Sequence, residues 1–312
     1  MRVEDISHVL FRAPDLPKMA KFLGDFGLIA HNIDGRLYAR GHGKSPYLHI
    51  TEPGDAGFAG LGFRAGSLAD LRALGATTGH VPVALNRPGG GFALVLRDPD
   101  GVTIEVVAGQ DLPDPIDLPP ADGWNSAQSR SRVSRFKRNA SSSHVVRLGH
   151  TVLSVTNFRR SEAWYKQHFG FLTSDEIEDQ SGAAIGAFLR CDRGDTPTDH
   201  HTLALVEGVG DIVFNHAAFE VADLDDLLAG HRRLANAGWV PHWGVGRHLI
   251  GSQVFDYWFD PWGHKLEHWT DGDLLTRNDG SRTASLEELH ATQWGSAEPR
   301  ASASDTSFPI RH

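Results

Sequence analysis

An internal repeat is the feature that most constrains how this chain can fold. The segment SHVL at residues 7–10 corresponds to GHTV at residues 149–152, and each is followed further along by Phe-Gly and an apolar residue. The halves also end alike, with RDPDGVTIEVVAG at residues 97–109 and FDPWGHKLEHWTDG at residues 259–272. Such self-similarity is the signature of a duplicated unit. Because 312 residues also suit two domains of roughly 100 to 200 residues each, the sequence predicts a duplicated domain.

Each half divides again into a strand, a helix and several short strands. In the second half, Leu148, His150 and Val152 share one face of a strand by alternation. A helix over residues 158–169 follows, and Gly170 ends it. The other predicted elements of this half are strands at 183–191, 201–207, 212–221, 253–259 and 264–269 and a helix at 223–237. We therefore expect an α+β protein built from four βαβββ modules.

Shifts in composition divide the chain into four parts. We expect an N-terminal domain at residues 1–108, a linker at 109–146, a second domain at 147–272 and a polar C-terminal tail at 273–312. The linker begins Pro-rich and becomes rich in Ser and Arg, which is typical of a tether. The tail predicts a surface helix at 285–291, with a cover over an active-site mouth as the alternative.

Five basic residues cluster in the linker: Arg130, Arg132, Arg135, Lys137 and Arg138. We interpret this segment as a solvated tether in an otherwise acidic protein. A basic arm that binds an acidic partner is the alternative.

Composition excludes several classes of protein. With 40% hydrophobic and 22% charged residues, the chain resembles an ordinary globular protein, and it has no apolar run of the roughly 18 residues that a membrane span needs. A net charge of −9 argues against nucleic acid as a partner. Acidic residues stand where a signal peptide would have its apolar core, so we expect a cytoplasmic location. Cys191 is the single cysteine, which excludes an internal disulfide and a thiolate-rich metal site.

Three residues of the second half have the chemistry of metal ligands. His150, His216 and Glu267 each lie on a different predicted strand. Two neutral imidazoles and one carboxylate, with open positions left over, form the facial set of oxygen-activating non-haem Fe(II) enzymes. Taken singly, each histidine could instead be a hydrogen-bonded core residue. Glu267 fits that alternative less well, because a carboxylate among apolar neighbours is costly unless it is paired or ligated.

The end of the second half carries a motif with several fixed spacings. It contains Gly246-Arg247-His248, then Tyr257, then Asp260-Pro261-Trp262-Gly263 and finally Glu267. In this motif residues 147–272 resemble the catalytic domain of the type I extradiol ring-cleaving catechol dioxygenases, which belong to the vicinal oxygen chelate (glyoxalase/bleomycin-resistance/dioxygenase) superfamily. The resemblance implies two tandem domains over about residues 1–272, each a curved mixed sheet or open barrel with helices outside. Asp256 departs from the family, which usually has an aliphatic residue there, so the departure concerns packing around the tyrosine.

The same resemblance implies a role for each residue of the motif. His150, His216 and Glu267 are expected to bind Fe(II), with Mn(II) as the alternative because the same ligands suit either ion. His201 matches the acid-base histidine, with its neighbour His200 as the competing assignment. His248 and Tyr257 are expected to hydrogen-bond the bound substrate and oxygen. The implied reaction inserts both atoms of O2 into a catechol and opens the ring beside its two hydroxyls.

The substrate is only faintly indicated. Five tryptophans surround the motif, at positions 239, 243, 258, 262 and 269, which suggests an aromatic cavity or, for most of them, ordinary core packing. Family members that take carboxylated catechols resemble one another in an arginine where Trp243 stands. We therefore expect a catechol or trihydroxybenzene with an uncharged substituent, in a pocket lined by Trp243, His200 and Val152. Since relatives are usually oligomeric, we expect a homo-oligomer.

The first half provides an internal control. Its repeat places His8 on His150 and Glu105 on Glu267, but Gly60 stands where the second half has His216. We expect no complete metal site there, with His8 and Glu105 hydrogen-bonded in place. Three alternatives to the main hypothesis remain: a hydroquinone-type ring-cleaving enzyme, a glyoxalase-like enzyme with ligands from paired modules, and a metal-free aromatic-ligand-binding protein of the same fold.

Overall fold

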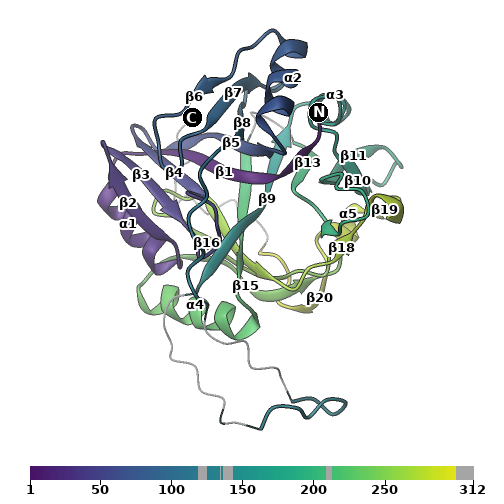
Figure 1. Cartoon of the computed structure of the whole chain (residues 1–312). Coiled ribbons are helices and arrows are strands. Elements are labelled where there is room, and N and C mark those ends of the chain that lie inside the picture. The colour runs from purple at the N-terminus through teal and green to yellow at the C-terminus, as the bar shows by residue number, and fades with distance from the viewer. Residues whose placement is uncertain (119–124, 134, 136–142, 209–212, 300–312) are drawn as a thin grey trace.

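The computed structural model describes residues 1–118, 125–133, 135, 143–208 and 213–299. Over these residues the chain is a mixed α+β protein in which strands predominate (Figure 1). The helices are α1 (Leu16–Asp25), α2 (Leu68–Thr78), α3 (Phe158–Phe169), α4 (Leu224–Asn236) and α5 (Leu286–Leu289), with a 3₁₀ turn η1 (Arg277–Asp279). None of the helices in this described part is long and apolar enough to cross a membrane.

The first half forms an eight-stranded sheet in the order β2-β3-β4-β1-β5-β8-β7-β6. Its strands are β1 (Val3–Ala13), β2 (Ile29–Ile33), β3 (Arg36–Arg40), β4 (His49–Pro53), β5 (Gly57–Ala65), β6 (Val83–Ala84), β7 (Phe92–Arg97) and β8 (Thr103–Ala108). Two βαβββ modules meet at the antiparallel pair β1 and β5.

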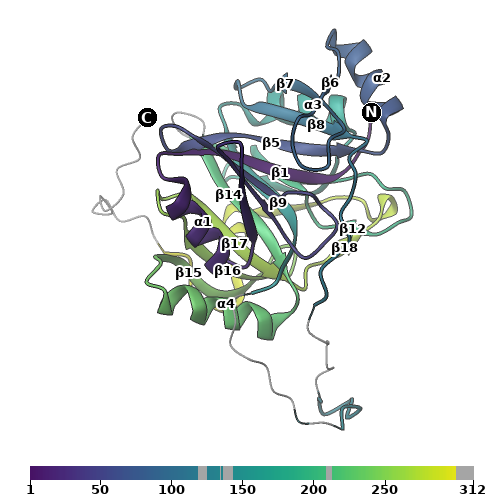
Figure 2. The same cartoon turned by 60° about the vertical axis from the view of Figure 1, so that its left-hand side comes forward.

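The second half forms a ten-stranded sheet in the order β19-β10-β11-β13-β9-β14-β17-β16-β15-β20, while β12 and β18 pair separately. Its strands are β9 (Val145–Val155), β10 (Leu172–Glu178), β11 (Ala184–Arg190), β13 (Leu203–Glu207), β14 (Val213–Val221), β15 (Pro241–His248), β16 (Val254–Phe259), β17 (Lys265–Thr270), β19 (Arg282–Ser285) and β20 (Thr292–Gly295). The small pair is β12 (Thr198–Asp199) and β18 (Leu274–Leu275). This sheet curves, and α4 lies on its outer side (Figures 1 and 2).

The two halves repeat one pattern, as the sequence predicts. The antiparallel pair β9 and β14 occupies the centre of the second sheet as β1 and β5 occupy the centre of the first. Helix α3 coincides with the predicted helix, because the Asn157 side chain caps its first turn and Gly170 ends it in the left-handed conformation. The sequence pattern did not predict the strand β15, whose residues alternate weakly in polarity.

A hydrophobic core runs through both halves. The Phe11 ring of β1 meets Phe214 of β14 with centroids 5.1 Å apart, and the Phe63 ring of β5 meets Phe169 of α3 at 5.2 Å. These residues belong to one continuous cluster of buried side chains. Since apolar burial is the main favourable term in folding, the first half is a packing partner of the second.

The C-terminal segment differs from the predicted polar tail. Residues beyond 272 contribute β19 and β20 to opposite edges of the second sheet, and β18 pairs with β12. The predicted surface helix is present in shorter form as α5, and residues 300–312 lie outside the described part. The sheet therefore extends past the predicted boundary, since edge pairing does not require an apolar alternating pattern.

Of the predicted linker, the described start lies along the first half. The Ile116 amide donates to the His42 carbonyl at 2.7 Å, and the Arg40 guanidinium donates to the Asp114 carbonyl at 2.9 Å. Lys137 and Arg138 of the basic cluster lie outside the described residues.

Candidate metal centre

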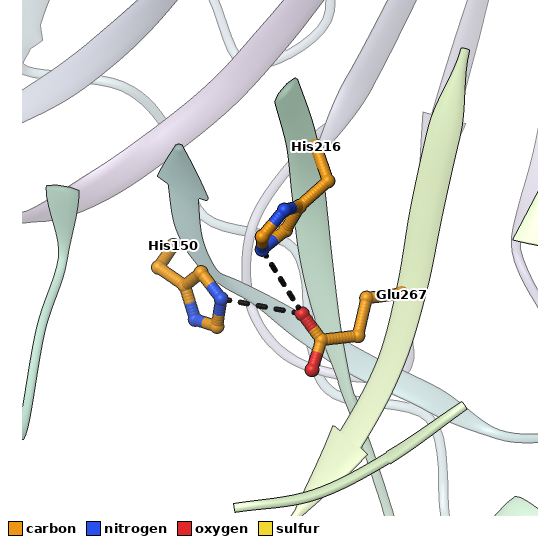
Figure 3. A group of neighbouring side chains, drawn as sticks. All are labelled: His150, His216 and Glu267. Atoms are coloured by element: carbon orange, nitrogen blue, oxygen red, sulfur yellow. Dashed lines mark ion pairs between the residues drawn. The ribbon is translucent and has the colours of Figure 1, made fainter. Parts of the chain in front are cut away.

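Three adjacent strands bring His150, His216 and Glu267 together. Ala218 of β14 pairs with His150 of β9 on one side and with Glu267 of β17 on the other. His216 lies two residues before Ala218, so alternation places its side chain on the same face. Figure 3 shows the two imidazoles converging on one oxygen of the carboxylate. The curved sheet thus gathers residues that are far apart in the sequence.

The spacing of the three side chains suits one metal ion. Oε2 of Glu267 is 3.3 Å from Nε2 of His150 and 3.2 Å from Nε2 of His216. Ligand atoms of the three residues all lie within 4.8 Å of one another. Bonds of about 2.1 Å at right angles would separate neighbouring ligand atoms by about 3 Å. The set therefore has the size of one face of a coordination sphere.

The electrostatics of the cluster also suit a cation. Glu267 is fully buried, and neither of its carboxylate oxygens has a hydrogen-bond partner in the described structure. Burial lowers the pKa of His150 to about 3 and that of His216 to about 4, so both imidazoles are neutral at pH 7. A buried carboxylate without compensation is costly. A divalent ion would supply the missing charge, and neutral imidazoles are the form that ligates it.

The neighbour of His216 fixes its orientation. Nδ1 of His216 lies 2.9 Å from Oδ1 of Asn215, so the ring donates its Nδ1 proton there and leaves the Nε2 lone pair facing Glu267. The strand carries a bulge between Phe214 and His216, so adjacent residues here depart from strict alternation. Sequence reasoning missed Asn215 because alternation points neighbours to opposite faces.

Gly149 is required beside His150 by the packing of the sheet. A Cβ at this position would lie 2.4 Å from Cζ2 of Trp269. Only glycine lets the Trp269 indole lie so close to β9 at this position. The indole ring is also near the His150 ring, with centroids 6.1 Å apart. Packing against Trp269 thus explains why a glycine precedes His150.

His201 lies against the candidate ligands, and His200 lies behind it. The His201 and His150 rings have centroids 4.0 Å apart, and both His200 and His201 are buried. His200 turns its Nε2 towards Asp175 at 2.5 Å. Burial holds the pKa of His201 well below its usual value, so its imidazole is neutral at pH 7. The geometry thus favours His201 over His200 as the group that reaches a substrate, because the His201 ring packs against His150 while His200 turns to Asp175.

His248 and Tyr257 form a second pair beside the ligands. Nε2 of His248 is 3.0 Å from the Tyr257 hydroxyl, and Tyr257 pairs in register with Glu267. Burial lowers the pKa of His248 to about 4 and raises that of Tyr257 well above its usual value. Both groups are therefore neutral at pH 7 and can orient a substrate through hydrogen bonds.

An aromatic wall adjoins this pair. Trp243 stacks on Tyr257 with centroids 5.6 Å apart and packs against Phe255 at 4.4 Å. The Trp243 indole donates a hydrogen bond to the Ser296 carbonyl at 2.9 Å, which joins it to the C-terminal segment. Val152 is buried opposite His216 on β9. The predicted pocket residues Trp243 and Val152 thus lie beside the cluster, and Phe255 is an addition that the sequence did not indicate.

The other tryptophans are packing residues, as most of them were predicted to be. The Trp258 indole donates to Oδ2 of Asp256 at 2.6 Å, and the Trp239 indole donates to Oδ2 of Asp25 at 2.9 Å. Asp256 also accepts from His231 at 3.0 Å. This unusual aspartate therefore has its own partners and does not disturb Tyr257.

The first half keeps two of the three positions but not the third. His8 and Glu105 flank Gly62 as His150 and Glu267 flank Ala218, and the register places Gly60 where His216 stands. Nε2 of His8 is 3.0 Å from Oε2 of Glu105, which the Arg87 guanidinium also contacts. As predicted, His8 and Glu105 are hydrogen-bonded in place. Among the described residues, the second half alone holds a group of three side chains spaced for a metal.

Comparison with known proteins gives a consistent result. The family model described as the Glyoxalase/Bleomycin resistance protein/Dioxygenase superfamily matches residues 147–268. Metapyrocatechase 2 of Cupriavidus necator is 30% identical over 281 residues, which cover 88% of this chain and 82% of that protein.

Solved structures show the same fold. The Mn(II)-bound glyoxalase from Novosphingobium aromaticivorans superposes with a TM-score of 0.77 at 22% identity, covering 100% of this chain and 95% of that one. The 2,3-dioxygenase LapB from Pseudomonas sp. KL28 gives a TM-score of 0.74 at 19% identity, covering 92% and 99%.

Proposed function

The chain belongs to the metapyrocatechase family of extradiol ring-cleaving dioxygenases, within the glyoxalase/bleomycin resistance protein/dioxygenase superfamily, and from this premise we propose how its residues perform the reaction. It is an oxidoreductase that cleaves a catechol with O2. We propose that His150, His216 and Glu267 hold the divalent metal, that this metal is Fe(II), and that the substrate carries an uncharged substituent.

The observation that carries the metal assignment is the state of Glu267. Its two oxygens are buried without hydrogen bonds, and two neutral imidazoles face one of them. When bound, a divalent metal supplies the positive charge that favours the deprotonated catechol and the redox chemistry with dioxygen. The carboxylate and imidazole donors suit Fe(II) and Mn(II) alike, so Fe(II) rests on the family's chemistry.

His201 would move the substrate proton. It is neutral and buried against His150, so a catechol hydroxyl at the metal would lie within its reach. The ring nitrogen that accepts this proton would return it to oxygen as the ring opens, since histidine can act as base and then as acid.

His248 and Tyr257 would orient the substrate from the other side. The imidazole and the hydroxyl already share a hydrogen bond of 3.0 Å, and a neutral tyrosine can donate to an oxygen that develops negative charge. Replacing either group is expected to slow turnover without releasing the metal.

The walls of the site support an uncharged substituent. Trp243 and Phe255 form an apolar face beside Tyr257. Arg247, the cation next to His248, turns instead to the Asp271 carboxylate at 2.6 Å. A carboxylated substrate would meet Lys265, which pairs in register with His216, and for this reason the test below includes such substrates.

The test is dioxygen uptake by protein loaded anaerobically with Fe(II). We expect stoichiometric uptake and a yellow ring-fission product with 3- or 4-substituted catechols that carry no charge, and slower uptake with the carboxylated catechols tested beside them. Parallel loading with Mn(II) separates the two metals by rate. His201→Ala is expected to retain metal and bind catechol while ring cleavage slows. Uptake with hydroquinones alone, or none with bound Fe(II) verified by metal analysis, would contradict the proposal.

A further inference from the structure

We propose that Asp175 and His200 are positioning residues that decide which ring nitrogen of His201 carries a proton. They form a buried chain of hydrogen bonds that ends at His201, the residue that packs against the candidate ligand His150. This inference rests on the proposed function, in which His201 accepts a proton from the catechol.

The chain of contacts is short and enclosed. Oδ2 of Asp175 is 2.5 Å from Nε2 of His200, and Nδ1 of His200 is 3.1 Å from Nδ1 of His201. All three side chains are at most 4% exposed. The Ser174 hydroxyl also donates to the His200 carbonyl at 2.5 Å, which holds the backbone of the pair against β10.

The direction of donation follows from Asp175. An ionised carboxylate only accepts, so Nε2 of His200 must donate to it. In the neutral form of His200 that the proposal requires, the lone pair lies on Nδ1, and Nδ1 of His201 then donates across the 3.1 Å contact. Nε2 of His201 is therefore left as the lone pair, which is the form that a base requires. In the reverse arrangement Nε2 would carry a proton and could not accept one.

Arg282 of β19 holds the carboxylate in this role. Its Nε lies 3.3 Å from Oδ1 of Asp175, and the two residues pair in register where β19 joins β10. Burial alone would raise the pKa of Asp175, but the hydrogen bond from His200 and the charge of Arg282 lower it, so the group stays ionised. The C-terminal segment thus reaches the catalytic histidine through one ion pair.

The substitution Asp175→Asn would reverse the direction of donation along these hydrogen bonds. Arg282 can only donate, so it would retain the amide oxygen and turn the amide NH2 towards Nε2 of His200. His200 would then accept at Nε2 and donate at Nδ1, and His201 would carry its proton on Nε2. This reversal differs from a packing defect, because an amide is nearly isosteric with a carboxylate.

The experiment compares Asp175→Asn with the wild type in the full-length chain loaded with Fe(II). We expect kcat to fall by about 100-fold, in the range that general acid-base catalysis contributes, while the anaerobic dissociation constant for catechol stays unchanged. Long-range 1H–15N spectra of the histidines, measured with Zn(II) as a diamagnetic probe and assigned with His201→Gln, should show the His201 proton moving from Nδ1 to Nε2.

A second variant separates this role from simple damage. Adding Arg282→Ala to Asp175→Asn frees the amide to rotate, so its oxygen can again accept from His200, and part of the lost kcat should return. Arg282→Ala alone keeps the carboxylate as an acceptor, so His201 should keep the wild-type tautomer in this variant. The proposal would be overturned if Asp175→Asn kept the wild-type His201 tautomer and the wild-type kcat. It would also be overturned if kcat were lower in the double variant than in Asp175→Asn alone.

Failure of the proposed function would look different. In that case the wild type itself would cleave no catechol, while the spectra would still report the His201 tautomer in both proteins.

Discussion

Both halves of the molecule place a glutamate beside a histidine, but the two carboxylates have different neighbours. Each holds a histidine and a glutamate at matching positions around the central strands, as His8 with Glu105 and His150 with Glu267. In the first half, Arg87 contacts Glu105 directly and its side chain is 8% exposed. In the second half two neutral imidazoles and the neutral Tyr257 hydroxyl lie beside Glu267, and none of the described ion pairs joins it to an arginine or a lysine. A guanidinium thus neutralises the first carboxylate, whereas the second is the one that we propose binds a cation.

Backbone geometry keeps the first half from regaining a third ligand. Gly60, at the position of His216, has φ of 152°, and a Cβ there would lie 2.4 Å from the Thr103 carbonyl oxygen. A histidine would be strained at this position and would clash with β8. The backbone of β5 therefore excludes a histidine at this position, in addition to the residue type.

The largest contrast is expected from the substitution Glu267→Gln. Removing the charge should abolish metal retention and lower kcat by at least about 1,000-fold, since the metal supplies several kcal/mol of stabilisation. Metal analysis and oxygen uptake measure both effects. The metal-free variant should melt no lower than metal-free wild type, because an uncompensated buried charge has been removed. Full activity would contradict the assignment of this carboxylate as a ligand.

The same substitution in the first half, Glu105→Gln, should have the opposite profile. It leaves the Arg87 guanidinium buried without its carboxylate, which costs about 3 kcal/mol. We expect a lower melting temperature by calorimetry and an unchanged metal content and kcat per folded molecule. Loss of the metal with retained stability would show that the first half participates in the site.

The pH dependence of stability should sharpen this comparison. Burial would raise the pKa of Glu105, but the hydrogen bond from His8 and the charge of Arg87 lower it to about 2. The folded state thus binds the proton less readily than the unfolded chain, whose glutamate titrates near 4.3. This stabilisation is complete above that value and is lost as the pH falls towards 2, by about 3 kcal/mol in all. Denaturant unfolding at several pH values should show a flatter profile for Glu105→Gln; parallel profiles would contradict the ion pair's role.

The smallest effect is expected at Asn215. Asn215→Ala removes the acceptor that orients the His216 ring, and partners of this kind are worth about 10-fold or more in metal affinity. Competition with a chelator measures the loss. Asn215→Asp keeps an acceptor and should restore most of the affinity. Since the first half has Gly60 in place of His216, it offers no counterpart to this effect.

Much of the fold could be read from the repeat. Helix α3 begins and ends where predicted because Asn157 and Gly170 are local signals. The sequence did not predict the strands β19 and β20. A short edge strand is defined by the strand that it pairs with and not by an alternation of apolar and polar residues. The sheet of the second half therefore includes strands beyond the predicted boundary at residue 272.

The sequence by itself determined the duplicated architecture and the three candidate ligands, because the repeat, the glycine before His150 and the spacing up to Glu267 are all local features of the chain. Only the tertiary structure decided which residues support them. Asn215 orients His216 beside a bulge in the strand. Asp175 and Arg282 meet where β10 pairs with β19. Arg87 contacts Glu105, which is 18 residues away in the sequence. Hydrogen bonds and ion pairs act over a few ångströms in space, so distance along the chain gives no signal of them.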